Sequence, residues 1–417
     1  MNIKQLVKNV LGQSNWNRTV STVKYGKSNC FFLLNHVQKM QVSDEWAASE
    51  YSVPKRHTFF GYYDIQPFNE KENKLLAHVV AKKAKTSVDK AQIGYFNVNE
   101  KEFHEVATTR AWCWQQGARL RWHPILRDCI VFNDVEEDHY ISKTVNVDSG
   151  EVIQQTPMAL YDFDSDFTFG LSLNFARLQR LRPGYGYDTL PDVTENDNAP
   201  SEDGIFYVDL KNNKTQLIVS LSSLAAECDP DKKYEHYINH ISISPDGSRF
   251  MFFHIYTISD GVWKTRLCVY SMNDGTINVL EEADKVSHYD WRGNHELLVT
   301  CYTPEKKQYY AVYNVINREK SILASEYLQK DGHPSFFADT NRFISDTYPL
   351  ANQLQHLFEY NMEEKGLNEI VSAYSSPLMY GEKRCDMHPR LSVSEQYISF
   401  DSTFSENRRK IVLLKRK

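Results

Sequence analysis

Short apolar runs separated by polar turns dominate the chain from about residue 59 onward. Typical runs are "KLLAHVV" at 74–80, "RFMFFHIY" at 249–256 and "YYAVYNV" at 309–315. Asn, Asp, Gly and Lys residues stand between such runs, and β-branched and aromatic residues are frequent within them, which favours strands over helices. Apart from a short helix expected at "SSLAAECD" (222–229), this part of the chain is predicted to be all-β.

Several of the runs fall into a repeated unit. The phrases "NHISISPDG", "SHYDWRGN", "GHPSFFAD" and "MHPRLSVS" each begin a short strand, a turn and a second strand, and place histidines at His240, His288, His333 and His388. A weaker relative, "GYYDIQPF", starts at Gly61. Spacings of roughly 40–55 residues with about four short strands per unit are typical of β-propeller blades. The length predicts about seven four-stranded blades, with six and eight as alternatives.

The N-terminal segment differs from the repeats. Apolar residues from Ile3 to Leu11 recur at helical spacing, so residues 1–25 are predicted to form a short amphipathic helix. It either packs on the domain or makes a peripheral contact with a membrane or partner. Residues 26–417 are assigned to one propeller, with an insertion at about 161–203, and a strand at 30–37 is expected to complete the last blade.

Composition restricts the function. The net charge of −6 gives no electrostatic support for nucleic-acid binding. No apolar stretch is long enough for a transmembrane helix, and the start has no apolar core of signal-peptide type. Seven separate cysteines without a CxxC pair are typical of reduced thiols. We therefore expect a cytoplasmic monomer or dimer, membrane-peripheral if the N-terminal helix makes that contact.

The repeated histidines predict a shared site. Residues at one position of successive propeller blades lie around the same end of the central axis, so the four imidazoles are expected to converge. Converging neutral imidazoles can ligate a divalent transition metal or act as a general base. The structural alternative is one internal hydrogen-bonding histidine in each blade.

These phrases resemble the His-bearing blade starts of oligogalacturonate lyases and related TolB-like propellers, over roughly 236–403. The resemblance implies a seven-bladed propeller with a divalent metal, typically manganese, held by three His and a Gln, and a further His and an Arg for the chemistry. This chain departs from the pattern at "KRCDMHPR" (383–390), which has no Gln. The implied metal ligands are His288, His333, Asp386 and His388. The implied catalytic residues are His240, His288, Arg384 and Arg390.

The resemblance implies β-elimination on an acidic, uronate-containing oligo- or polysaccharide. Arginines suit sugar carboxylates. The insertion contains "RLQRLR", which would place Arg177 and Arg180 on one face of a helix. The alternative interpretation is a solvated basic turn. The expected substrate-binding residues are Arg177, Arg180, Arg182, Tyr185 and Arg266. The alternative function is a non-catalytic propeller that binds a saccharide or a protein during cell-surface polysaccharide biosynthesis.

Overall fold

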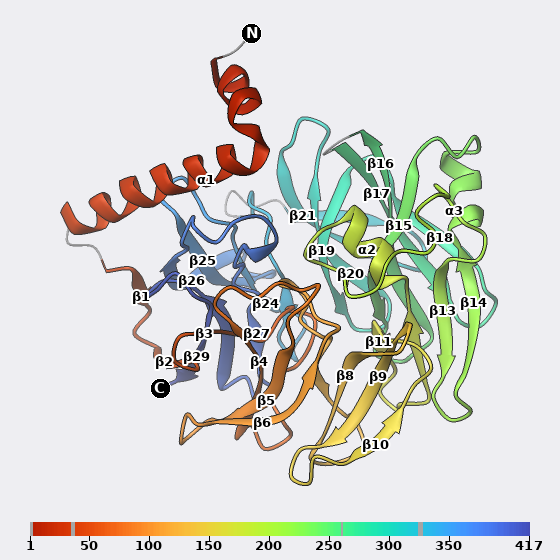
Figure 1. The fold of residues 1–417 in the computed structure, drawn as a ribbon, viewed down its shortest axis with the longest axis horizontal. Coiled ribbons are helices and arrows are strands. Elements are labelled where there is room, and N and C mark those ends of the chain that lie inside the picture. Colours follow the sequence, from red (N-terminus) through yellow and green to blue (C-terminus); the bar gives the residue numbers. More distant parts are fainter. Residues whose placement is uncertain (1–2, 35–37, 260–261, 324–327) are drawn as a thin grey trace.

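Seven antiparallel sheets form a ring in the computed structural model of the protein, which describes residues 3–34, 38–259, 262–323 and 328–417 (Figure 1). Six sheets have four strands, and one carries a fifth strand on its outer edge. The predicted seven-bladed β-propeller with an N-terminal helix is confirmed. Each sheet alone would leave both faces exposed, and the ring buries them against neighbouring sheets.

The first three blades come from the N-terminal half of the propeller. Blade 1 consists of β3 (Arg56–Phe59), β4 (Lys74–Ala81), β5 (Ala91–Asn97) and β6 (Phe103–Thr109). Blade 2 consists of β7 (Arg121–Trp122), β8 (Cys129–Glu136), β9 (His139–Asn146) and β10 (Val152–Gln155). Blade 3 consists of β11 (Asp162–Phe163), β12 (Phe169–Ser172), β13 (Gly204–Asp209) and β14 (Lys214–Ser220).

The remaining blades carry the repeated histidines. Blade 4 consists of β15 (Glu235–Ile243), β16 (Arg249–Ser259), β17 (Val262–Ser271) and β18 (Ile277–Glu281). Blade 5 consists of β19 (Lys285–Arg292), β20 (Glu296–Tyr302), β21 (Gln308–Asn314) and β22 (Lys320–Leu323). Blade 6 consists of β23 (Ser335–Phe336), β24 (Arg342–Asp346), β25 (Leu354–Asn361), β26 (Gly366–Tyr374) and the edge strand β1 (Met40–Val42). Blade 7 consists of β2 (Trp46–Tyr51), β27 (Arg390–Leu391), β28 (Tyr397–Ser402) and β29 (Lys410–Arg416).

The ring closes by pairing an N-terminal strand with the C-terminal one. Strand β2 pairs antiparallel with β29, from Trp46 opposite Arg416 to Tyr51 opposite Ile411. The prediction that residues 30–37 supply this strand is wrong, because residues 30–34 belong to a helix, while 35–37 lie outside the described residues. The segment "WAASEY" buries only its terminal aromatic residues, so its apolar pattern is too sparse to predict a strand.

The insertion begins later than the sequence predicts. Residues 162–172 contain β11 and β12 of blade 3, and only 173–203 separate β12 from β13. A two-residue and a four-residue strand are too short to show an alternating pattern. The inserted segment contains α2 (Phe175–Leu181), capped by Asn174, whose side chain accepts a hydrogen bond from the backbone N–H of Arg177. The predicted short helix after β14 is α3 (Leu221–Cys228).

Helix α1 (Ile3–Leu34) is longer than predicted, with a break at Gly12, where φ is 73° and ψ is 158°. Its second part lies beside β25 and β26, and its first part turns away from the ring (Figure 1). The hydroxyl of Ser28 is hydrogen-bonded to the hydroxyl of Tyr374 at 3.1 Å. The ring of Phe32 packs edge-on against the same tyrosine, with 5.2 Å between the ring centroids. The side chains of residues 1–11, on which the predicted amphipathic face depends, lie outside the described residues. No helix in the described ranges is both long and apolar enough to span a membrane.

Carboxylates join neighbouring blades. Asp162 accepts a hydrogen bond from the backbone of Ile243 at 2.7 Å, and Asp290 accepts one from Phe336 at 2.7 Å. Asp401 of the last blade accepts one from Phe60 of the first at 3.1 Å. These bonds satisfy backbone donors in or next to the first strand of the following blade, and they link successive blades.

Candidate active site

The four repeated histidines meet at one end of the ring axis. His240 and His288 lie in the first strands of blades 4 and 5, while His333 and His388 each precede the first strand of blades 6 and 7 by two residues. The ring centroids of His288 and His333 are 4.1 Å apart, those of His333 and His388 are 4.3 Å apart, and those of His240 and His288 are 6.3 Å apart. All four side chains are buried. The convergence predicted from the repeat is confirmed.

His333 and His388 are oriented in the way that metal-binding histidines usually are. Nδ1 of His333 lies 2.7 Å from Oδ1 of Asp346, and Nδ1 of His388 lies 2.8 Å from the carbonyl oxygen of Gly61. In the neutral imidazoles, these acceptors place the ring proton on Nδ1 and leave the lone pair on Nε2, while the carboxylates around His333 raise its pKa. Both Nε2 atoms are buried without a hydrogen-bond partner among the described residues. A buried lone pair without a donor is costly unless another group binds it.

Asp386 supplies the third donor. The ligand atoms of His333, Asp386 and His388 all lie within 4.8 Å of one another. The guanidinium of Arg384 also binds this carboxylate, with Nε 2.8 Å from Oδ1 and Nη2 2.6 Å from Oδ2. Burial raises the pKa of the Asp386 carboxyl, but the guanidinium of Arg384 outweighs burial and holds the pKa below its ordinary value. Asp386 is therefore ionised.

His288 forms a pair with Asp331. Its Nδ1 lies 2.9 Å from Oδ1 of Asp331, and Asp331 also accepts hydrogen bonds from Thr300 at 2.7 Å and from Tyr302. Burial and the neighbouring His333 lower the pKa of His288, although Asp331 opposes them. His288 is consequently neutral, with Nδ1 protonated and Nε2 free to accept a proton. His288 and His240 both line a pocket next to the cluster.

His240 is held by two tyrosines. Its Nε2 lies 3.2 Å from the hydroxyl of Tyr62, and its Nδ1 lies 3.3 Å from the hydroxyl of Tyr161. Burial lowers the pKa of His240 well below its ordinary value, with His288 adding to the effect. Its backbone is left-handed, with φ of 56°, at a register shift between Asn239 and Ser242. His388 is also left-handed, with φ of 48°. Left-handed conformations of non-glycine residues cost energy and cluster at functional sites.

The first blade contributes two tyrosines to the site that the histidine pattern does not include. The ring of Tyr62 lies 5.1 Å from that of His240 and 4.8 Å from that of His388. Tyr63 donates its hydroxyl proton to the carbonyl of Tyr289 at 2.8 Å and accepts the N–H of the same residue at 2.8 Å. The sequence does contain a pattern that indicates this position: "GYYD" at Gly61 aligns with "SHYD" at Ser287, which places Tyr62 opposite His288.

Three of the arginines expected to bind substrate are held in ionic or backbone contacts outside the cluster of His240, His288, His333 and His388. Arg177 is buried and donates to the carbonyls of residues 194, 197, 198 and 236. Arg180 pairs with Asp192 and Glu235, and Arg266 pairs with Glu227 and Glu282. Arg177 and Arg180 thus fasten the inserted segment to blade 4.

Other predicted residues do approach the centre. Arg182 and Tyr185 line the pocket beside His240 and His288. Arg384 lies between Asp386 and the ring of Tyr348, 5.1 Å from its centroid. Arg390 is buried against the carbonyls of Gly61 and Tyr62, with Nη2 2.6 Å from the former and Nε 3.2 Å from the latter.

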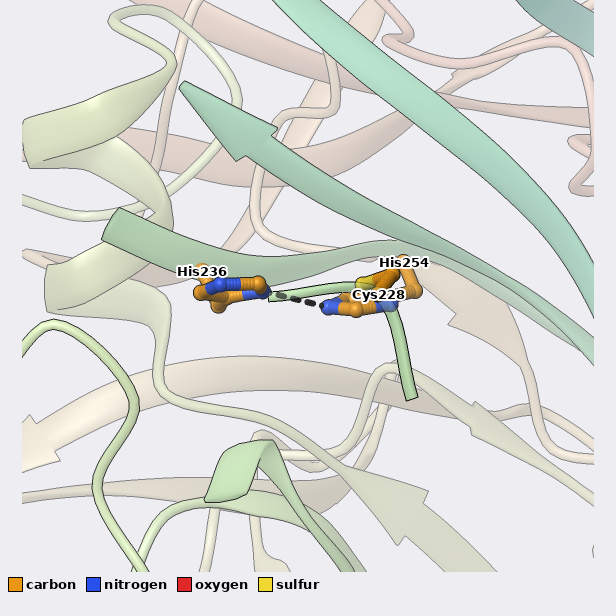
Figure 2. A group of neighbouring side chains, drawn as sticks. All are labelled: Cys228, His236 and His254. Atoms are coloured by element: carbon orange, nitrogen blue, oxygen red, sulfur yellow. Dashed lines mark hydrogen bonds between the residues drawn. The ribbon is translucent and has the colours of Figure 1, made fainter. Parts of the chain in front are cut away.

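A second cluster, contributed by α3 and blade 4, has metal-ligand residue types in a different hydrogen-bonding state. Cys228, His236 and His254 place their ligand atoms within 4.8 Å of one another (Figure 2). Nδ1 of His236 lies 2.8 Å from Nε2 of His254, and the outer nitrogens contact Asp229 at 3.2 Å and Arg266 at 3.4 Å. Arg266 only donates, so the protons are ordered from Arg266 through both rings to Asp229. Every imidazole nitrogen is thus occupied, unlike Nε2 of His333 and His388.

Comparison with known proteins identifies the fold. No family model matches the chain, and no curated protein matches it. Among solved structures, an oligogalacturonate lyase in complex with manganese is 14% identical, with a TM-score of 0.64 over 91% of this chain and 99% of that chain. The oligogalacturonate lyase from Vibrio parahaemolyticus is 12% identical, with a TM-score of 0.64 over 91% and 97%. The tricorn protease is 12% identical, with a TM-score of 0.52 over 87% and 33%. The predicted resemblance to oligogalacturonate lyases is therefore confirmed for the fold.

Proposed function

We propose that this protein is a metal-dependent lyase that acts on uronate-containing oligosaccharides. The observation that carries the proposal is the pair of buried, unpartnered Nε2 atoms of His333 and His388 beside the Asp386 carboxylate. The shared fold with oligogalacturonate lyases, one of them in complex with manganese, supports the same assignment. A site with a neutral His288 next to this donor set suits the removal of a proton alpha to a carboxylate.

The donor set fits a divalent cation such as manganese. His333, Asp386 and His388 would hold the cation, and Asp346 and the Gly61 carbonyl would orient the two imidazoles. When bound, such a cation stabilises the additional negative charge that develops on a substrate carboxylate as its alpha proton leaves. Two imidazoles and one carboxylate are ligands that manganese and zinc both accept.

We assign the base to His288. Its Nδ1–H is held by Asp331, so Nε2 points its lone pair away from that carboxylate and toward the pocket. In the elimination, Nε2 takes the alpha proton, and the C–H electrons form a double bond to the beta carbon. The bond from the beta carbon to the glycosidic oxygen breaks, and that oxygen leaves with a proton from the protonated imidazole or from water. Asp331 stabilises the imidazolium that forms between the two transfers.

A binding propeller without catalysis is the second candidate. The observation that favours it is the double contact between Arg384 and Asp386, which occupies the carboxylate that a metal would need. If this ion pair persists in solution, the histidines lack their third ligand. The protein would then bind an acidic saccharide without cleaving it, in a pathway of cell-surface polysaccharide synthesis.

The deciding experiment is an absorbance assay for the unsaturated uronate product. The protein is incubated with Mn²⁺ and a panel of acidic oligosaccharides that covers galacturonate, mannuronate and glucuronate. We expect product from one class, and a loss of at least about a hundredfold in rate for His288→Ala. His139→Ala is the control, because His139 is exposed on the surface. Binding without product from any substrate would favour the second candidate.

A further inference from the structure

Two cations lie on one aromatic ring in the pocket beside the histidines. Nζ of Lys285 lies 3.3 Å from the ring centroid of Trp263, and the guanidinium carbon of Arg182 lies 4.4 Å from the same centroid. The guanidinium also lies 5.3 Å from the ring of Tyr185. Arg182 belongs to the inserted segment, Trp263 to β17 and Lys285 to the start of β19. The indole thus makes cation–π contacts with two positive charges.

Neither cation is neutralised by an ion pair. Within the described ranges, neither Arg182 nor Lys285 makes a salt bridge or a side-chain hydrogen bond. Asp331 is near enough for its negative charge to raise the pKa of Lys285. Its oxygens already accept hydrogen bonds from His288, Thr300 and Tyr302. Two half-buried positive charges without a counter-ion are unfavourable, and an anion bound between them would relieve that cost.

The same pocket wall carries a buried hydroxyl group without a partner. Thr265 Oγ1 has no hydrogen-bond partner in the described part of the chain, and Thr265 is only 2% exposed. Thr265 and Trp263 are two residues apart on β17, so both side chains point to the same face of the sheet. His240 and His288 line the same pocket. A ligand that reaches the histidines from this side therefore passes the two cations and a free hydroxyl.

We propose that Arg182, Lys285 and Thr265 form a subsite for the carboxylate of a second acidic sugar residue, next to the residue at the histidine centre. The inference rests on the proposed function and deepens it, because it selects substrates with at least two neighbouring uronates over a single uronate. The indole holds the cations in place, and the guanidinium fork and the ammonium bind the carboxylate from two directions.

The charge state of the lysine agrees with this role. Burial and the neighbouring Arg182 lower the pKa of Lys285 to about 8. A bound carboxylate would favour the charged ammonium and raise that pKa again, so anion binding and protonation support each other. The pocket therefore selects for negative charge as well as for shape.

The test measures the binding of trigalacturonate, trimannuronate and a glucuronate-containing tetrasaccharide to the full-length protein by calorimetry, with and without Mn²⁺. For the probe that binds best, we expect Lys285→Gln and Arg182→Gln each to weaken binding by about tenfold, and Lys285→Arg to restore most of it. Lys264→Gln is the matched control, because Lys264 is exposed beside Trp263 on the opposite face of β17. The fully methyl-esterified probe is expected to bind weakly and equally to the wild type and to Lys285→Gln.

The outcomes separate this subsite from the proposed reaction. Equal binding by Lys285→Gln and Lys264→Gln would overturn the subsite, as would tight binding of the ester or no binding of any acidic probe. Lys285-dependent binding without product formation would disprove the elimination and leave the subsite standing. Product formation with the same KM in wild type and Lys285→Gln would support the elimination and disprove the subsite. Thermal unfolding of each variant checks that the fold is retained.

Discussion

One buried carboxylate, that of Asp346, positions both His333 and His388. Its Oδ1 lies 2.7 Å from Nδ1 of His333, and its Oδ2 accepts the backbone N–H of His388 at 3.2 Å. Asp346 ends β24, so a single strand of blade 6 aligns the first residues of two successive blades. Asp346 thereby orients the imidazole of His333 and holds the backbone of His388, whose own ring is oriented by the carbonyl oxygen of Gly61.

Asp346→Asn is therefore expected to weaken metal binding by about 10- to 100-fold without removing a metal ligand. The asparagine amide has one acceptor oxygen where the carboxylate has two, so its NH2 group must face either His333 or the backbone N–H of His388, and one of the two histidines loses its hydrogen bond. Calorimetric titration with Mn²⁺ and Zn²⁺ measures the change. Asp339→Asn, in an exposed turn of the same blade, serves as the control. Unchanged affinity in Asp346→Asn would show that the carboxylate does not orient the site.

The two histidine clusters are expected to differ in metal content. His388→Ala removes one of the two free Nε2 atoms. The purified variant, loaded with Mn²⁺ or Zn²⁺ and then dialysed against metal-free buffer, should therefore retain neither ion. Cys228→Ser should leave the metal content unchanged, because the nitrogens of its cluster are already occupied by hydrogen bonds. Elemental analysis gives both answers. Two ions per chain in the wild type, reduced to one by Cys228→Ser, would contradict this assignment.

The repeat made the propeller and the meeting of its histidines predictable. One position of four consecutive units is occupied by His240, His288, His333 and His388. Because the units are arranged around a ring, residues at this shared position converge. Tyr62 occupies the same position of blade 1, but a tyrosine there did not stand out as part of a histidine pattern. The predicted pattern thus described the C-terminal half of the ring more completely than the N-terminal half.

Other features depend on contacts that no local pattern contains. Arg177 and Arg182 belong to the same basic run, yet Arg177 is buried against backbone carbonyls and Arg182 lies on Trp263. Those partners are up to about 80 residues away along the chain, so spacing alone could not separate the two arginines. The same holds for the closing strand Trp46–Tyr51, whose partner β29 lies at the other end of the chain.

Stability should decrease as the pH falls below about 6.5, the ordinary pKa of histidine. Burial lowers the pKa of most buried histidines, to about 4 for His57 and His78. The unfolded chain therefore binds more protons than the folded one below pH 6.5, and protonation favours unfolding. His333 opposes this trend, because the carboxylates around it outweigh burial and raise its pKa. The histidines with lowered pKa are His57, His78, His123, His236, His240, His254, His288 and His388.

His57→Gln isolates one contribution to this pH dependence. Nδ1 of His57 accepts the backbone N–H of Arg409 at 3.1 Å, and Nε2 donates to the carbonyl of Lys82 at 3.2 Å. A glutamine amide offers the same acceptor and donor without titrating. Between pH 7 and 5.5, the variant should lose about 1 kcal/mol less unfolding free energy than the wild type. Urea denaturation at both pH values measures the difference, and parallel losses in the two proteins would contradict the pKa shift.

Gly332 leaves no room for a side chain next to His333. A Cβ atom there would lie 1.9 Å from the backbone oxygen of Asp346 and 2.8 Å from the hydroxyl oxygen of Tyr310. Gly332→Ala must therefore push β24 away from the first residues of the blade, with an expected loss of about 3 kcal/mol. The same shift separates Asp346 from His333, so metal affinity should fall with stability. Gly366→Ala, with open space around it in the same blade, should change neither quantity. A stable Gly332→Ala variant with full metal affinity would show that the close approach does not hold His333 in place.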